Sequence, residues 1–332
     1  MNHALLLDRN GSAKELTYEE INGATLPDNG ILWVHFDYSS EIAKDWIRNK
    51  SGIDSVAIDA LLTEETRPRT TILNDAFLIA LRGVNLNPNS KPEDMVSIRL
   101  FVSSNLIITT KRRNLLSVDE IIDCLKNGTG PKSSSEFLNE LTYRVTSRME
   151  GVIDELEDRT DSLEESLIDS NDSKFRSELL SIRRETIILR RYLFPQKEAM
   201  SKLYHDKVTW LTEYEKIELR ETNDQLMRYI EELDTIRDKV ALIQEELSNK
   251  LSEQMNKKMY VLSIISVIFL PLTFLTGLLG INVDGIPGAD NERAFFNFLV
   301  IFQSFIMATF FPDKSSIFIK SNLLFFVIID NS

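Results

Sequence analysis

Residues 259–282 form an apolar stretch that contains no charged side chain. At about 1.5 Å of rise per residue, a helix of this length crosses the roughly 30 Å hydrocarbon layer of a bilayer. A core helix of a soluble protein normally carries charges on its outer face, and this stretch has none. The pattern therefore predicts a transmembrane helix.

The polar residues in and just before this stretch fall on one side of the predicted helix. At a turn of 100° per residue, one face about 100° wide holds Asn256, Met259, Ser263, Ser266, Leu270, Thr273 and Gly277. Hydroxyls and an amide inside a membrane need a neighbouring helix or water as a partner. One helix cannot enclose a pore, so conduction requires several copies around an axis, with Met259 and Leu270 as apolar constrictions. Alternatively, the hydroxyls bond to carbonyls of their own helix or pack against a neighbour.

The first part of the chain, residues 1–130, has the pattern of an α+β domain with a mixed sheet. Short apolar runs bounded by turn residues predict strands at 31–37, 77–84, 95–102 and 106–110, and residues 41–65 repeat on a helical period. This part contains neither a glycine-rich phosphate loop nor a Ser/His/Asp arrangement, so we do not expect an enzyme.

After the breaker at 127–131 the pattern is helical. Residues 131–212 predict an acidic antiparallel helical hairpin, with a turn at 169–172 and a second helix that runs back toward Pro195. Its many carboxylates indicate a solvated surface or, alternatively, a surface that concentrates cations. Residues 213–258 contain no glycine or proline and predict a stalk helix that continues into the span. A helix this long with one apolar seam favours a bundle of identical chains.

Beyond the first span we predict an outer loop at 283–293, a second transmembrane helix at 294–311 and an atypical tail at 312–332. We interpret the tail as a shifted reading frame or an altered C-terminus. Lys250, Lys257 and Lys258 precede the first span, and cytoplasmic flanks are rich in such cations. With no cleavable signal peptide, the N-terminal domain is expected in the cytoplasm of a multi-pass membrane protein.

The overall charge changes the list of possible partners. The 332 residues include 38 bases and 51 acids, a net charge of −13, which argues against a nucleic-acid partner. Cys124 is the single cysteine, and the three histidines are scattered along the chain. A disulfide within the chain and a Cys/His metal site are therefore excluded, and no cofactor is expected.

Several motifs resemble those of one known family. Gly280-Ile281-Asn282 follows an Ile-Phe-Leu-Pro-Leu-Thr helix and precedes a second apolar run. This resembles the CorA superfamily of divalent-cation transporters, whose mark at this place is Gly-Met-Asn. With Ile281 in the methionine position, the chain looks like the ZntB zinc-transporter branch. The stretches 32–38, 64–69, 92–99, 253–256 and 283–291 are similar to the same branch.

The resemblance implies a homopentamer in a bacterial inner membrane, with a funnel-shaped cytoplasmic domain and a pore lined by the first span. Gly280, Ile281 and Asn282 would then meet the hydrated cation at the outer mouth. Asn256, Met259, Leu262, Leu270 and Thr273 would line the path inward.

The chemistry of this lining leaves the cargo open. Met259 offers the one soft ligand, whereas zinc without its water prefers thiolate and imidazole. We therefore expect a hydrated ion; the choice of zinc rests on the resemblance, and magnesium, cobalt or nickel would fit equally. Efflux and proton-linked uptake are both open, with Glu245, Glu246 and Glu253 as candidates for proton coupling. A membrane-anchored coiled-coil scaffold that conducts nothing is a further alternative.

Overall fold

The computed structural model describes residues 3–23, 30–64, 67–167 and 173–279, together with six residues between 293 and 304. The chain divides into two compact units, residues 1–246 and 247–332. The turn predicted at 169–172, the motif at 280–282 and the tail at 312–332 lie outside the described residues. So do nearly all of the outer loop and most of the second span. The domain boundaries given above stay predictions.

The first unit contains a seven-stranded mixed sheet with strand order β2-β1-β3-β7-β6-β5-β4. Its strands are β1 (His3–Leu7), β2 (Ala13–Glu15), β3 (Ile31–Asp37), β4 (Arg69–Leu73), β5 (Ala76–Gly83), β6 (Val96–Val102) and β7 (Leu106–Lys111). β3 and β7 are parallel, from Leu32 beside Leu106 to Asp37 beside Lys111, and the other pairs are antiparallel. The four predicted strands are confirmed, and β3 has the predicted bounds.

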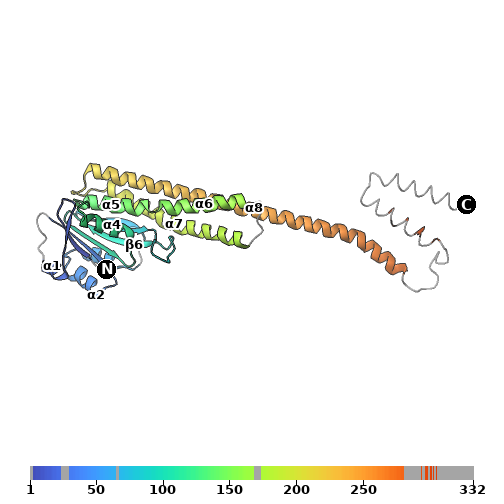
Figure 1. Cartoon of the computed structure of the whole chain (residues 1–332), viewed down its shortest axis with the longest axis horizontal. Helices are drawn as coiled ribbons and strands as arrows, with labels where there is room; N and C mark the ends of the chain where they lie inside the picture. The colour runs from blue at the N-terminus through green and yellow to red at the C-terminus, as the bar shows by residue number, and fades with distance from the viewer. Residues whose placement is uncertain are drawn as a thin grey trace. The chain divides into compact units, whose positions relative to one another are not determined.

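Helices cover both faces of the sheet. They are α1 (Tyr18–Gly23), α2 (Glu41–Asn49), α3 (Ser55–Leu62), α4 (Leu116–Lys126), α5 (Ser134–Ser147), α6 (Glu150–Ser166), α7 (Ser173–His205) and α8 (Glu213–Leu279). On one face, Trp46 and Leu61 of α2 and α3 pack in a core with Phe36 of β3. On the other, Phe137 of α5 meets Trp33 of β3 edge to face, with ring centroids 4.6 Å apart. Figure 1 shows the sheet between α2 and α5. Because β3 is covered on both faces, its first four residues are all apolar and buried.

The structure adds detail to two helix predictions. Residues 41–65 form two helices, because Gly52 takes a left-handed conformation (φ +68°) and Asp54 caps α3 by accepting from the Val56 amide at 2.8 Å. α7 continues through Pro195 to His205. The buried Gln196 accepts a hydrogen bond from the Arg82 amide at 2.7 Å, which fixes α7 to β5 just after the proline. This tertiary contact stabilises α7 at the point where Pro195, which has no amide hydrogen, cannot donate a helical hydrogen bond.

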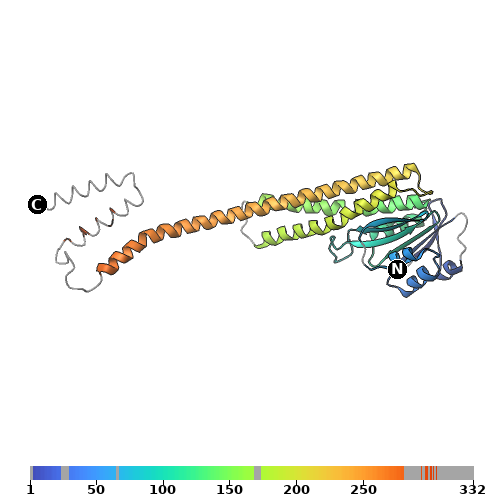
Figure 2. The ribbon, with the colours of Figure 1, turned by 180° about the vertical axis from the view of Figure 1, so that it is seen from behind.

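Ion pairs join α6, α7 and the part of α8 that belongs to the first unit, and both ribbon views show these helices side by side (Figures 1 and 2). Arg159 of α6 contacts Glu178 and Glu185 of α7 at 2.7 and 2.8 Å, and Lys239 of α8 contacts Asp161 at 2.8 Å. Burial opposes ionisation of Glu185, but its bonds from Arg159 and Ser181 lower its pKa. Part of the acidic surface is therefore neutralised within the chain.

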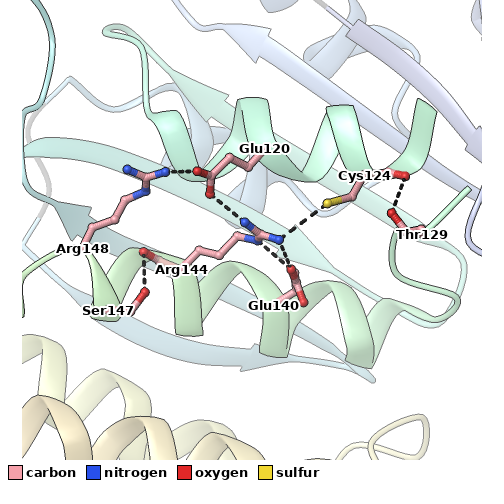
Figure 3. Close-up of polar contacts among 7 residues, drawn as sticks. All are labelled: Glu120, Cys124, Thr129, Glu140, Arg144, Ser147 and Arg148. Carbon is pink, nitrogen blue, oxygen red and sulfur yellow. Dashed lines mark hydrogen bonds and ion pairs between the residues drawn. The ribbon is translucent and has the colours of Figure 1, made fainter. Parts of the chain in front are cut away.

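A second charged network joins α4 to α5 (Figure 3). Arg144 contacts Glu120 at 2.7 Å and Glu140 at 2.5 Å, and Arg148 also contacts Glu120. The sulfur of Cys124 accepts from Arg144 Nη2 at 3.6 Å. The network fixes the position of α4 against the helix that carries Phe137.

Candidate ion-conducting face of α8

The second unit contains the membrane-length part of α8. In the part of the chain that the structure describes, one helix has an 18-residue window apolar enough to cross a bilayer, and none of that window is buried. Leu270 is 71% exposed, and Met259, Tyr260 and Phe274 are also exposed. Such a continuous apolar surface needs lipid or other chains around it.

The hydroxyls on the polar face bond to their own helix. Ser263 Oγ donates to the carbonyl of Met259 at 2.8 Å, Ser266 Oγ to that of Leu262 at 2.9 Å, and Thr273 Oγ1 to that of Phe269 at 2.8 Å. Each hydroxyl hydrogen is thereby used, whereas the oxygen keeps its capacity to accept. The face therefore presents acceptors, which suit the outward-pointing hydrogens of a hydrated cation.

Pro271 leaves one carbonyl of α8 without its usual donor. It lies inside α8, which continues to Leu279. Because proline has no amide hydrogen, the carbonyl of Val267 loses its usual helical donor.

The opposite side of the helix is mostly apolar, with Ile264, Ile265, Ile268 and Leu272. Thr276 also lies outside the polar face, and its hydroxyl donates to the Thr273 carbonyl at 3.1 Å. Thr276 therefore carries a hydroxyl that is bonded to its own helix, as that of Thr273 is, but it lies on the side that we expect to face lipid or a second helix.

The predicted site residues fall into three groups. Those from Asn256 to Gly277, with Leu262, all lie on α8 in the second unit. Gly280, Ile281 and Asn282 lie outside the described residues. Glu245 and Glu246 are exposed in the first unit. The roles of all these residues stay predictions.

Glu253, the third proton candidate, pairs with Lys257 at 2.8 Å. The hydrogen bond and charge of Lys257 lower the pKa of Glu253. A group that exchanges protons near neutral pH works best with a pKa near 7. In this pair Glu253 is therefore held as a carboxylate.

Comparison with known proteins decides the family. Residues 28–312 match the family model described as CorA-like Mg²⁺ transporter protein. The chain belongs to this CorA-like family. The resemblance drawn from the sequence motifs is thereby confirmed.

Two relatives show how far the likeness extends. The divalent cation transporter CmaX of Pseudomonas aeruginosa is 39% identical, over 88% of this chain and 89% of the relative. The zinc transport protein ZntB of Pectobacterium carotovorum is 34% identical, over 90% of each chain.

Solved structures agree with the fold. The structure of full-length CmaX matches with a TM-score of 0.82 and 36% identity, over 94% of this chain and 96% of that one. The CorA magnesium transporter of Methanocaldococcus jannaschii matches with a TM-score of 0.76 over 92% and 95% of the two chains. At 17% identity, the latter supports the fold alone. The predicted α+β domain with a long helix is therefore confirmed.

Proposed function

We propose that this protein transports divalent metal cations, zinc foremost, along the polar face of α8. One observation carries the proposal: a membrane-length helix, unburied by the described residues, carries the oxygens of Ser263, Ser266 and Thr273 on one side. In a CorA-like chain, this is the arrangement expected of a pore-lining helix.

A single copy of α8 cannot surround an ion, so the proposal includes a homo-oligomer. Five copies around an axis would place the polar faces toward a central column of water. The opposite apolar side, which carries Ile264 and Leu272, would face lipid or a second helix. The first unit would lie in the cytoplasm of a cell with this protein in its inner membrane, and Gly280, Ile281 and Asn282 would form the outer mouth.

The acceptor character of the face supports passage of an ion with its water. Hydroxyl and carbonyl oxygens bind the water shell, whereas dehydrated zinc would require softer ligands. Within the described ranges, no group of three or more His, Cys, Asp or Glu residues is placed to hold a metal. Zinc is proposed because relatives at 34% identity bear the name zinc transport protein.

A magnesium or cobalt channel of the same fold is the second candidate. The description of the family model names Mg²⁺, and an oxygen-lined path suits a hard cation that dehydrates reluctantly. Competition between ions distinguishes the two candidates. If excess magnesium suppresses zinc flux completely while zinc barely affects magnesium flux, the cargo is magnesium.

The test is metal flux into liposomes that contain the purified full chain, followed with an internal metal-sensitive dye. We expect flux of zinc above that of magnesium, cobalt and nickel, and loss of flux with Asn282→Ala. Asn291→Ala, in the predicted outer loop that follows Asn282, is the matched control. Flux measured with and without a pH gradient separates proton-linked uptake from a passive path. Absence of flux for every metal would favour the non-conducting scaffold.

A further inference from the structure

A second polar site lies in the first unit, far in sequence from the polar face of α8. It is a cavity of about 220 Å³ whose polar lining includes Tyr38, Glu64, Arg82, Arg99, Arg112 and Arg113. Four of these side chains are guanidinium groups and one is a carboxylate. Such a basic lining contrasts with the net charge of −13 of the whole chain.

The topology of the sheet gathers these arginines. β5 and β6 pair with Arg82 opposite Ser97 and Ala80 opposite Arg99, so Arg82 and Arg99 belong to the same face. Tyr38 and Arg112 directly follow the parallel strands β3 and β7. In sheets with parallel strands, ligands commonly bind where the carboxyl ends of the strands meet.

Arg99 is the residue that points to a ligand. It is only 1% exposed and is the single charged residue of β6, in the middle of a strand that is otherwise apolar apart from Ser97. Its Nη2 donates to the Glu64 carbonyl at 2.6 Å, and its guanidinium lies 4.4 Å from the centre of the Tyr38 ring. Its Nε and Nη1 are buried and make no hydrogen bond within the described part of the protein.

A purely structural role accounts for only part of this geometry. The bond to Glu64 and the stacking on Tyr38 connect the end of α3 to β6. Among the described residues they leave Nε and Nη1 of this buried cation without an acceptor, and buried donors without an acceptor are costly. Burial also lowers the pKa of Arg99, because it disfavours the charged form, although arginine stays charged near neutral pH.

The neighbouring arginines indicate what would offset this cost. Arg82 donates to the Met95 carbonyl at 3.1 Å and stacks on Tyr192, so it is held in place beside the cavity. Arg112 and Arg113 are exposed and lie at the cavity's accessible side. Planar guanidinium groups match the oxygens of phosphate better than they match a spherical ion. The volume exceeds the roughly 30 Å³ share of one water several-fold, so a phosphate group fits.

We propose that the cavity at Arg99 binds a phosphate group, either free phosphate or the phosphate of a small soluble monoester. The anion accepts hydrogen bonds from Arg99 Nε and Nη1 inside the cavity and from Arg112 and Arg113 at its mouth. The site is separate from the α8 face, and binding of the anion does not depend on transport.

The test uses the purified full chain in detergent and metal-free buffer, titrated with inorganic phosphate and separately with AMP, and followed by calorimetry. Arg99 is buried, so its replacement endangers the fold, and the exposed arginines carry the test. Arg112→Gln is expected to weaken binding about tenfold, the effect of one lost hydrogen bond between charged groups. Arg176→Gln, an exposed arginine of α7 outside the cavity, is the matched control and should leave binding unchanged.

The two probes distinguish the source of the phosphate. Equal affinity means that the phosphate group alone is recognised, and tighter binding of AMP means that a soluble monoester is the ligand. Three results would overturn the proposal: no saturable binding of either probe up to about 10 mM, unchanged binding in the Arg112→Gln/Arg113→Gln double variant, or equal competition by chloride at the same ionic strength.

Discussion

Thr273 and Thr276 of α8 offer a direct comparison for the proposed path. Both hydroxyls donate to carbonyls of their own helix, at 2.8 and 3.1 Å. Thr273 lies on the polar face and Thr276 lies outside it. Replacement by valine keeps the size and branching of the side chain and removes only the oxygen, so Thr273→Val is expected to slow metal flux and Thr276→Val is not.

The magnitude follows from what each hydroxyl still offers. The hydrogen of Thr273 is bound to the Phe269 carbonyl, so valine removes one acceptor and no donor toward the ion's water. A net hydrogen bond contributes about 0.5–1.5 kcal/mol, and 1.4 kcal/mol corresponds to a factor of ten. We therefore expect flux to fall by roughly 2- to 10-fold. In the proposed homo-oligomer the same replacement occurs in every copy, which would make this a lower bound.

The assay is zinc uptake into liposomes at matched protein density, with both variants compared with the unchanged chain. Recovery of the same oligomer during purification is the control for folding. Equal loss in both variants, or loss with Thr276→Val alone, would mean that the polar face does not line the path.

Three further predictions concern the same chain. Leu270→Ala is expected to raise zinc flux in liposomes because it widens an apolar constriction, while Leu272→Ala on the opposite side leaves flux unchanged. Phe137→Ala removes a fully buried ring that packs on the sheet and should lower the free energy of unfolding by about 3–5 kcal/mol, against less than about 1 kcal/mol for the exposed Tyr143→Ala. All three tryptophans lie in the first unit, so their fluorescence during urea unfolding measures this difference. Arg159→Met should cost about 1–2 kcal/mol at neutral pH, since its ion pairs are half-buried. The bond from Arg159 lowers the pKa of Glu185, so the stability that this carboxylate contributes at neutral pH is lost as pH falls below the ordinary carboxylate range. The variant should therefore show a flatter stability profile between neutral and acidic pH, and an unchanged profile would contradict the assigned pairs.

The sequence predicts those elements that have a strong local pattern. β3 is an apolar run that follows a turn signal, and α8 contains no breaker from Glu213 to Pro271, so both were predicted closely. β1, β2 and β4 were missed because they are short and lie at or next to the edges of the sheet, where the pairing with neighbouring strands determines the structure. The helix across Pro195 was also unpredictable, since the contact of Gln196 with β5 joins residues far apart in sequence.

The polar face of α8 could be predicted because one helix carries the whole pattern. The cavity at Arg99 could not, because its arginines come from β5, β6 and the segment after β7. A local signal existed nonetheless: a charged residue in the middle of an apolar strand indicates a buried cation with a partner. Which partner it has depends on the order of the strands, and periodicity does not reveal this order.

The thiol that accepts from Arg144 gives a practical way to count subunits. Every copy of the chain carries one thiol, at Cys124, so one spin label per copy can be attached without removing other cysteines. In a closed ring, labels on adjacent copies and labels across the ring lie at different separations. The ratio of the two separations depends only on how many copies the ring contains, so a distance measurement by electron paramagnetic resonance reads the number of subunits directly.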